Sequence, residues 1–228
     1  MITQLVMFST IFLLILSGIK ILQKSKVINY FPGKIFSLGL FFIATGILFY
    51  AIRDVFVQFR IYEIQAQFIK YGAVLHFIGG FLIYWFLSRE FVSKTFLRDI
   101  TFGLFAFLMI LFIVITTGGI FTIENELQLA PFEPIPYSVV RNYISAPLGN
   151  IYLLGIIIGV SLLIFGIMLY NSLREENKAL RTKGLFYAWG ILLLIAPMGI
   201  CMLVSPIYAR IGYLFGAILI WRGFKIKT

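Results

Sequence analysis

The chain has few charged residues and almost none of the residues that form disulfides or metal sites. Of 228 residues, 12% are charged, one is a cysteine and one is a histidine. A single cysteine, Cys201, excludes a disulfide within the chain, and a single histidine provides no cluster of imidazole ligands. We therefore expect no cofactor, and no metal ion or haem held by one chain.

Motifs for catalysis are also missing. The sequence has no HExxH pattern, no phosphate-binding loop and no Ser/His pair. Every lysine lies near the end of an apolar block, which excludes a retinal Schiff base in mid-membrane. Glu175 and Glu176 followed by Arg181 resemble the glutamate pair of intramembrane CAAX proteases only in part, because the arginine lies one residue too far away. We expect the protein not to be an enzyme.

Long apolar blocks dominate what is present. Hydrophobic residues make up 61% of the chain, and the mean hydropathy is +1.01. Blocks of about 20 apolar residues bounded by charge suit helices that cross about 30 Å of hydrocarbon. The sequence predicts an all-α, polytopic membrane helical bundle, with residues 1–228 as a single transmembrane domain. Its seven transmembrane helices are expected at about Leu5–Leu22, Ile35–Ile52, Gln65–Leu87, Ile100–Thr117, Ile151–Tyr170, Gly184–Val204 and Pro206–Trp221.

The distribution of lysine and arginine predicts the orientation. Basic residues concentrate on the cytoplasmic side of membrane proteins. Five of the nineteen lie on the side of the second, fourth and sixth connections: Arg53, Arg60, Lys70, Arg141 and Arg210. The other fourteen lie on the opposite side: Lys20, Lys24, Lys26, Lys34, Arg89, Lys94, Arg98, Arg174, Lys178, Arg181, Lys183, Arg222, Lys225 and Lys227. We expect a multi-pass protein of the cell membrane with its amino terminus outside and its carboxyl terminus in the cytoplasm.

The net charge of +10 predicts a partner class. The basic residues form short clusters between apolar blocks and no continuous stripe, so we do not expect nucleic acid to bind. Anionic lipid headgroups on the cytoplasmic side are the expected partner.

Capping residues and the long connection give further local predictions. Asp99 and Asn150 are expected to cap the starts of the fourth and fifth helices. The outer loop, residues 118–149, contains four prolines. It suits a lid or a short interfacial helix over Tyr137–Ser145, and alternatively a plain connector.

The two halves of the sequence share a weak self-similarity. The best match pairs Gly79 with Gly216 and Ile83 with Ile220, and a second pairs Gly18 with Gly166. The matched segments are His76–Trp85 with Tyr213–Arg222, Leu13–Leu22 with Ser161–Tyr170 and, more loosely, Ile43–Ile47 with Ile195–Ile200. A real duplication implies a 3+1+3 parallel repeat with a cavity between the halves; the alternative is chance similarity between apolar segments.

His76 is the first candidate site residue. It has small residues one turn before and after it on the same helix face, so we expect it to face protein and not lipid. One hypothesis is a proton-responsive or ligand-binding imidazole. The alternative is an interhelical hydrogen bond worth about 1 kcal/mol. The repeat places the expected ligand site between the third and seventh helices, near His76 and Tyr213.

The outer mouth of the bundle is the second candidate. Arg53 and Asp54 end the second helix, and Arg210 lies at the start of the seventh. These groups could pair across the helix ends, hold an anionic ligand, or separately extend to the membrane interface.

Two segments carry a resemblance to a known family. Ser172–Pro197, with its basic loop, and Ile211–Phe224, with its glycine-spaced helix, resemble the last three helices of the seven-helix membrane sensor modules that precede kinase or cyclase domains in prokaryotes. The resemblance implies a receptor-like protein. Because the sequence stops at Thr228, we expect the signal to pass through a cytoplasmic signalling partner or a homo-oligomer.

Two other functions remain open at this stage. The seven-helix, N-out plan is also similar to that of SWEET-type sugar transporters, but the first, second and fifth helices have no proline and no Pro-Gln pair occurs. An accessory or structural subunit of a larger membrane complex fits the scarcity of polar residues in the helices.

Overall fold

The computed structural model describes residues 2–58, 62–91, 95–118, 122–127, 140–145, 159, 162, 165–203 and 206–226. These residues form seven helices and one small β-hairpin. The fifth helix is described at residues 159 and 162 and over residues 165–174. The other elements are α1 (Ile2–Val27), α2 (Phe31–Gln58), α3 (Tyr62–Phe91), α4 (Thr95–Gly118), β1 (Thr122–Leu127), β2 (Val140–Ser145), α6 (Lys178–Leu203) and α7 (Pro206–Lys225).

Three of the described helices are long and apolar enough to cross a membrane: Gln4–Val27, Phe31–Phe56 and Lys70–Glu90. The apolar part of α4 is shorter, Phe102–Thr117. Large hydrophobic side chains such as Phe12, Phe107 and Val114 are exposed on the helix surfaces, where lipid would cover them. These features indicate a membrane protein.

The first four helices, α1 to α4, extend beyond the predicted apolar blocks at both ends. α2, for example, continues through Arg53 and Asp54 to Gln58, because backbone hydrogen bonds do not stop where the hydrocarbon does. The prediction that Asp99 caps the fourth helix is wrong, since α4 already begins at Thr95. Asn150 lies outside the described residues. The sequence analysis missed the cap at Asn177, whose Oδ1 accepts from the backbone N of Ala179 at 2.9 Å.

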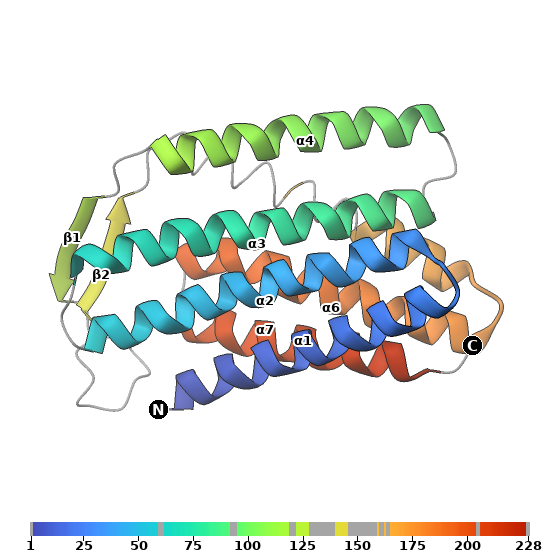
Figure 1. The fold of residues 1–228 in the computed structure, drawn as a ribbon, viewed down its shortest axis with the longest axis horizontal. Coiled ribbons are helices and arrows are strands. Elements are labelled where there is room, and N and C mark those ends of the chain that lie inside the picture. Colours follow the sequence, from blue (N-terminus) through green and yellow to red (C-terminus); the bar gives the residue numbers. More distant parts are fainter. Residues whose placement is uncertain are drawn as a thin grey trace.

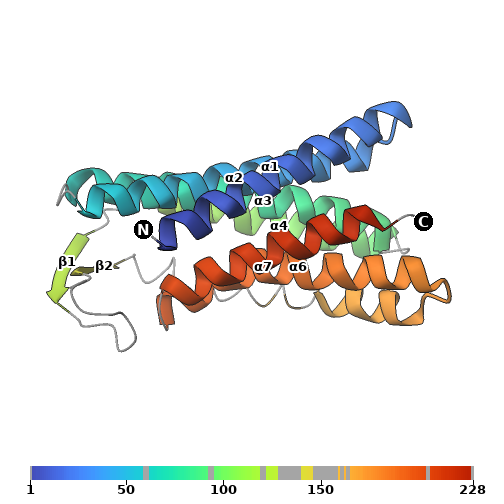
Figure 2. The ribbon, with the colours of Figure 1, turned by 90° about the horizontal axis from the view of Figure 1, so that it is seen from below.

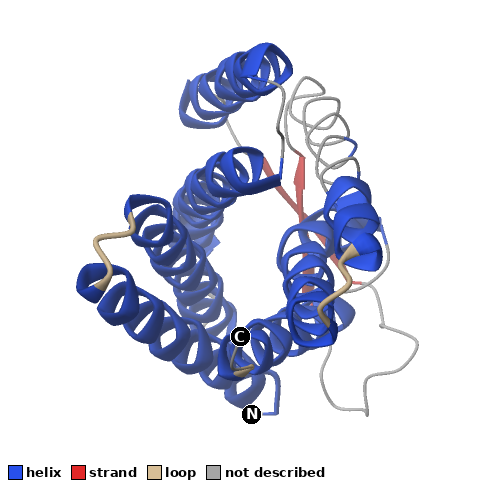
Figure 3. Cartoon of the chain, turned by 90° about the vertical axis from the view of Figure 1, so that its right-hand side faces the viewer, coloured by secondary structure: helices blue, strands red, loops and turns tan. Residues whose placement is uncertain are grey.

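The helices lie in two layers. Figure 1 shows α4, α3, α2 and α1 side by side, and Figure 2 shows them above a second layer that contains α6, α7 and residues 165–174. Viewed from the end, the helices surround a common axis (Figure 3). The closest-packed pairs are α2 with α3 and α6 with α7, while α1 contacts both α2 and α7. The fully buried core includes Leu14, Leu40, Ile43, Ile83, Leu194 and Ile220.

Glycines bring α2 and α3 into backbone contact. A Cβ added at Gly79 would lie 2.6 Å from the carbonyl oxygen of Gly39 and 2.8 Å from the backbone N of Ile43. One added at Gly46 would lie 2.8 Å from the carbonyl oxygen of Gly72. Small residues permit such approach in membrane helices, where packing is a main source of association. These glycines hold α2 and α3 together as one unit.

Glycines also bring α6 and α7 into backbone contact. A Cβ added at Gly216 would lie 2.8 Å from the carbonyl oxygen of Gly190, and one added at Gly190 would lie 3.0 Å from that of Gly216. Gly216 belongs to the small-residue pair Gly212–Gly216 in α7, a spacing that lets helix backbones approach closely. Gly159 in the fifth helix has the same spacing from Gly155 in the sequence, but nothing lies within 4 Å of a Cβ added at Gly159.

The outer loop contains a hairpin. β1 and β2 pair antiparallel, with Thr122 opposite Ser145 and Leu127 opposite Val140. The predicted helix over Tyr137–Ser145 is therefore wrong for residues 140–145, which form a strand. Val140, Tyr143 and Ile144 belong to residue types that favour strands, and pairing with β1 supplies their backbone hydrogen bonds. Residues 128–139 lie outside the described part.

Candidate functional site

His76 lies at the centre of the bundle and links the two layers. It is 2% exposed, and its Nε2 lies 2.9 Å from the carbonyl oxygen of Leu194 on α6. A carbonyl oxygen only accepts, so Nε2 carries the proton and donates it. In a neutral ring the other nitrogen, Nδ1, is then an acceptor. Nδ1 is buried and has no hydrogen-bond partner among the described residues.

Neighbouring elements fix the position of this imidazole. On α2, a Cβ added at Gly46 would lie 2.9 Å from the backbone N of His76, so only glycine permits α3 to come this close. The ring lies close to two tyrosines, with centroid distances of 5.4 Å to Tyr213 on α7 and 6.2 Å to Tyr50 on α2. The structure therefore brings the predicted pair His76 and Tyr213 together. The interhelical hydrogen bond that the sequence allowed for His76 is present.

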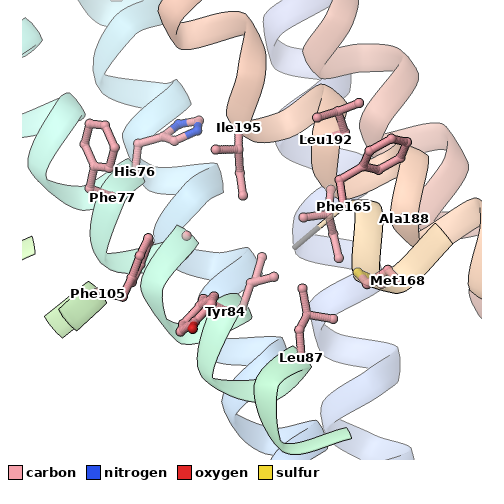
Figure 4. Close-up of a pocket in the computed structure, with 13 residues that line it drawn as sticks. His76, Phe77, Tyr84, Leu87, Phe105, Phe165, Met168, Ala188, Leu192 and Ile195 are labelled. Carbon is pink, nitrogen blue, oxygen red and sulfur yellow. The ribbon is translucent and has the colours of Figure 1, made fainter. Parts of the chain in front are cut away.

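A small cavity of about 30 Å³ lies beside His76. Among its lining residues only His76 and Tyr84 carry a nitrogen or oxygen in the side chain. Figure 4 shows the lining set, with the Tyr84 hydroxyl pointing away from the His76 ring. The walls come from α3, α4, the fifth helix and α6: His76, Phe77, Gly80, Ile83, Tyr84, Leu87, Phe105, Phe165, Met168, Ala188, Ile191, Leu192 and Ile195.

The outer-mouth residues form an ion-pair cluster. The Asp54 carboxylate accepts hydrogen bonds from Arg210 on α7 and, at 3.1 Å, from its neighbour Arg53. The three side chains are between 12% and 20% exposed. Of the alternatives that the sequence left open, pairing across the helix ends is the one observed. The cluster gives the two layers a second link, near the end of the bundle that carries the hairpin.

At the opposite end the two layers bring basic residues together. The pKa of Lys183 on α6 is lowered, first by burial and then by the positive charge of Lys24 on α1. Tyr30, in the turn between α1 and α2, has its pKa raised by burial and by its hydrogen bond to Glu90. Cations also lie over aromatic rings one turn earlier at three helix ends: Arg89 over Trp85, Arg174 over Tyr170 and Lys225 over Trp221.

Sequence reasoning missed two parts of the central site. The Leu194 carbonyl is a backbone group, and a backbone acceptor leaves no mark in the sequence. Gly80 lines the cavity and has nothing within 4 Å of an added Cβ, whereas in the sequence it is only one of the small residues that follow His76. In the described part of the chain, no three His, Cys, Asp or Glu side chains gather as a metal site.

Comparison with protein-family models, with curated proteins and with solved structures found no match for this chain.

Proposed function

We propose that the chain is a receptor-like, non-enzymatic membrane protein that senses a signal at its outer end or within the membrane and passes it to cytoplasmic partners. The observation that carries this proposal is the hydrogen bond from His76 to Leu194. It is the point in mid-bundle where α3 of one layer is joined to α6 of the other. A signal that breaks or weakens this hydrogen bond would shift the equilibrium between two arrangements of the layers. A conformational switch requires such a shift.

Seven spans with the amino terminus outside are part of the proposal. α4 has 24 residues, a length of about 36 Å that suffices for a bilayer core of about 30 Å. The cation–aromatic pairs at Arg89, Arg174 and Lys225 all lie at the end expected to be cytoplasmic. Tryptophan and tyrosine favour membrane interfaces, and basic residues favour the cytoplasmic one.

Equivalent glycine contacts support the 3+1+3 repeat. In each half, a Cβ added to the first glycine of the pair would lie 2.8 Å from an isoleucine Cγ1 and 3.2 Å from the backbone N of that isoleucine. The glycine and isoleucine are Gly39 and Ile83 in α2 and α3, and Gly190 and Ile220 in α6 and α7. Pairing Ile83 with Ile220 is what the sequence alignment predicted.

Two other parts of that alignment need a different register. Pairing Gly39 with Gly190 matches Ile43 with Leu194, one residue away from the predicted Ile195; both residues are fully buried. Gly18 is buried against Phe41, whereas Gly166 is exposed and faces open space. Ser25 and Ser172 make a better pair, because each lies against a glycine in the first two turns of the next helix, Gly33 in α2 and Gly184 in α6.

The cytoplasmic end suits an acidic partner. Lys24 on α1 and Lys183 on α6 come from different layers, and burial, followed by repulsion from the positive charge of Lys24, lowers the pKa of Lys183. A phosphate of a lipid headgroup, or a carboxylate of a signalling partner or second copy of this chain, would relieve this repulsion. The cavity of about 30 Å³ beside His76 is too small to hold a sugar, so this cavity does not support a SWEET-like transporter.

Pulsed electron spin distance measurements test the coupling. Spin labels at Lys26→Cys and Glu176→Cys, both exposed positions, report on the two layers in a Cys201→Ser background. His76→Phe keeps a ring but removes the hydrogen bond, and we expect it to change the mean label distance by about 2 Å or more. The matched control is Thr45→Val, which removes only a hydrogen bond within α2 and should leave the distance unchanged.

An unchanged label distance in the His76→Phe variant contradicts the coupling between the two layers.

Co-purification from native membranes distinguishes the receptor from the two alternative functions. A stoichiometric complex with a respiratory or transport enzyme would replace the receptor with an accessory subunit, and protein-dependent uptake into proteoliposomes would replace it with a transporter.

A further inference from the structure

We infer that the ion-pair cluster of Arg53, Asp54 and Arg210 binds one phosphate group, which accepts hydrogen bonds from arginine donors that Asp54 does not occupy. The inference deepens the proposed function and rests on it for the biological role, because it names the chemical class of an outer signal. The binding site stands on three observations: two arginines share one carboxylate, their spare donors are accessible, and the cluster lies at the end of a candidate membrane span.

The cluster carries one positive charge in excess. Asp54 presents Oδ1 to Arg53 and Oδ2 to Arg210, so each guanidinium receives one oxygen of the same carboxylate. An arginine with a carboxylate of its own often donates two parallel hydrogen bonds to it. Here two positive charges share one negative charge, and Asp54 is the only acidic side chain that pairs with either arginine in the described part of the chain. A singly charged anion would neutralise the cluster.

Both arginines keep donors that a ligand can reach. A guanidinium has five N–H donors, and each of these two donates to Asp54 through one nitrogen. Of the other guanidinium nitrogens in this described cluster, only Nε of Arg53 is buried without a partner, and a ligand would not contact it. Nη2 of Arg53, and Nε and Nη1 of Arg210, account for accessible surface on side chains that are 20% and 16% exposed.

The position of the cluster favours phosphate over other anions. The candidate span of α2 runs from Phe31 to Phe56, so Arg53 and Asp54 lie in its last turn. This end of α2 is the end of the bundle that carries the hairpin (Figure 1). Lipid phosphates lie just beyond the hydrocarbon core of a bilayer, and the planar fork of arginine matches phosphate oxygens. The phosphate can belong to a lipid headgroup or to a soluble compound.

A bound phosphate would add to the link between the two layers. Asp54 already joins α2 to α7 through Arg210. A phosphate that contacts Arg53 and Arg210 joins the same two helices and offsets the repulsion between the two guanidinium groups. A ligand that binds one arrangement more tightly shifts the population toward it. Phosphate binding would therefore favour the arrangement of the layers seen here.

Isothermal titration calorimetry of the full chain in maltoside micelles tests the inference, because this detergent has neither charge nor phosphate. The first probe is inorganic phosphate, and the second is dihexanoyl phosphatidylglycerol, a soluble lipid with a phosphodiester headgroup. Potassium chloride keeps the ionic strength constant. We expect saturable binding of at least one probe. Tighter binding of the lipid assigns the phosphate to a headgroup, and tighter binding of inorganic phosphate assigns it to a soluble compound; both results uphold the site.

Two substitutions should shift the affinity in opposite directions. Arg210→Gln should raise the dissociation constant at least about tenfold, because it removes hydrogen bonds from a charged donor. Asp54→Asn should lower it about fivefold or more, because it removes the carboxylate that competes for both arginines and repels the ligand. The matched control is Arg174→Gln, which removes an exposed arginine at the opposite end of the bundle and should leave the constant unchanged.

Arg210→Lys keeps the test usable if the other variants fold poorly. It retains the positive charge beside Asp54 but not the planar fork, so it should raise the dissociation constant by a smaller factor than Arg210→Gln. The inference is overturned if neither probe binds saturably, if Arg174→Gln weakens binding as much as Arg210→Gln or Arg210→Lys, or if Asp54→Asn weakens binding.

The spin-label distances distinguish this inference from the proposed function. Saturable phosphate binding without any distance change upon His76→Phe upholds the site and contradicts the receptor. A distance change upon His76→Phe without phosphate binding upholds the coupling and contradicts the site.

Discussion

Gly79→Ala should destabilise the folded protein by about 2–3 kcal/mol, at the upper end of the usual cost of overpacking. The added methyl would lie 2.6 Å from the carbonyl oxygen of Gly39 and 2.8 Å from the backbone N of Ile43. Backbone atoms cannot rotate away as a side chain can, so α2 and α3 would have to separate. Reversible unfolding in mixed detergent micelles, followed by helicity, measures the change in free energy.

The adjacent residue provides the control. Gly80→Ala meets no atom within 4 Å, so it should leave stability unchanged or raise it by up to about 1 kcal/mol through helix propensity. Gly216→Ala should resemble Gly79→Ala, because its methyl would lie 2.8 Å from the Gly190 carbonyl oxygen. Equal effects at positions 79 and 80 would refute the close packing, and a neutral Gly216→Ala would count against the repeat.

Asp54→Asn should have the second large effect, a loss of about 2–3 kcal/mol of stability. The substitution leaves Arg53 and Arg210 close together without the carboxylate that both contact. Breaking a fully buried pair costs about 3–5 kcal/mol, and the partial exposure of these side chains reduces that figure. The same unfolding assay applies, and high salt should diminish the difference.

A double-mutant cycle isolates the interaction between the layers. In an Arg210→Gln background, Asp54→Asn should cost clearly less, because the main partner is already absent. Glu176→Gln removes an exposed carboxylate and should change stability by no more than about 0.5 kcal/mol. Additive effects of the two substitutions would mean that the pair does not join α2 to α7 in the membrane.

Apolar patterning was enough to predict where the helices lie, since each apolar block falls within a helix wherever the structure describes it. The residues at which the helices begin and end were less predictable. The apolar block of the fourth helix starts at Ile100, whereas α4 starts at Thr95, because helical hydrogen bonding continues into polar residues. The hairpin formed by β1 and β2 depends on pairing between segments separated by residues 128–139, which local preferences do not encode.

Glycine spacing carried information that the sequence analysis did not use. Gly39 and Gly46 on α2, and Gly72 and Gly79 on α3, are each seven residues apart, which places each pair on one helix face. The proximity of His76 to Tyr213 was predicted from the alignment of the two halves. Its bond to the Leu194 carbonyl was not, since any backbone group on a facing helix could have accepted it.

The central claim is that two equivalently oriented helix triplets are joined by a membrane-spanning α4. Residue 26 lies in the last turn of α1 and residue 176 just after the fifth helix, so four crossings between them would put both on the same side. A membrane-impermeant maleimide applied to single-cysteine variants in a Cys201→Ser background tests this directly. The account predicts that Asn125→Cys, in the hairpin, reacts in intact cells, while Lys26→Cys and Glu176→Cys react only after permeabilisation. Labelling of positions 26 and 176 from opposite sides would contradict it, because one of the helices between them would then not cross the membrane.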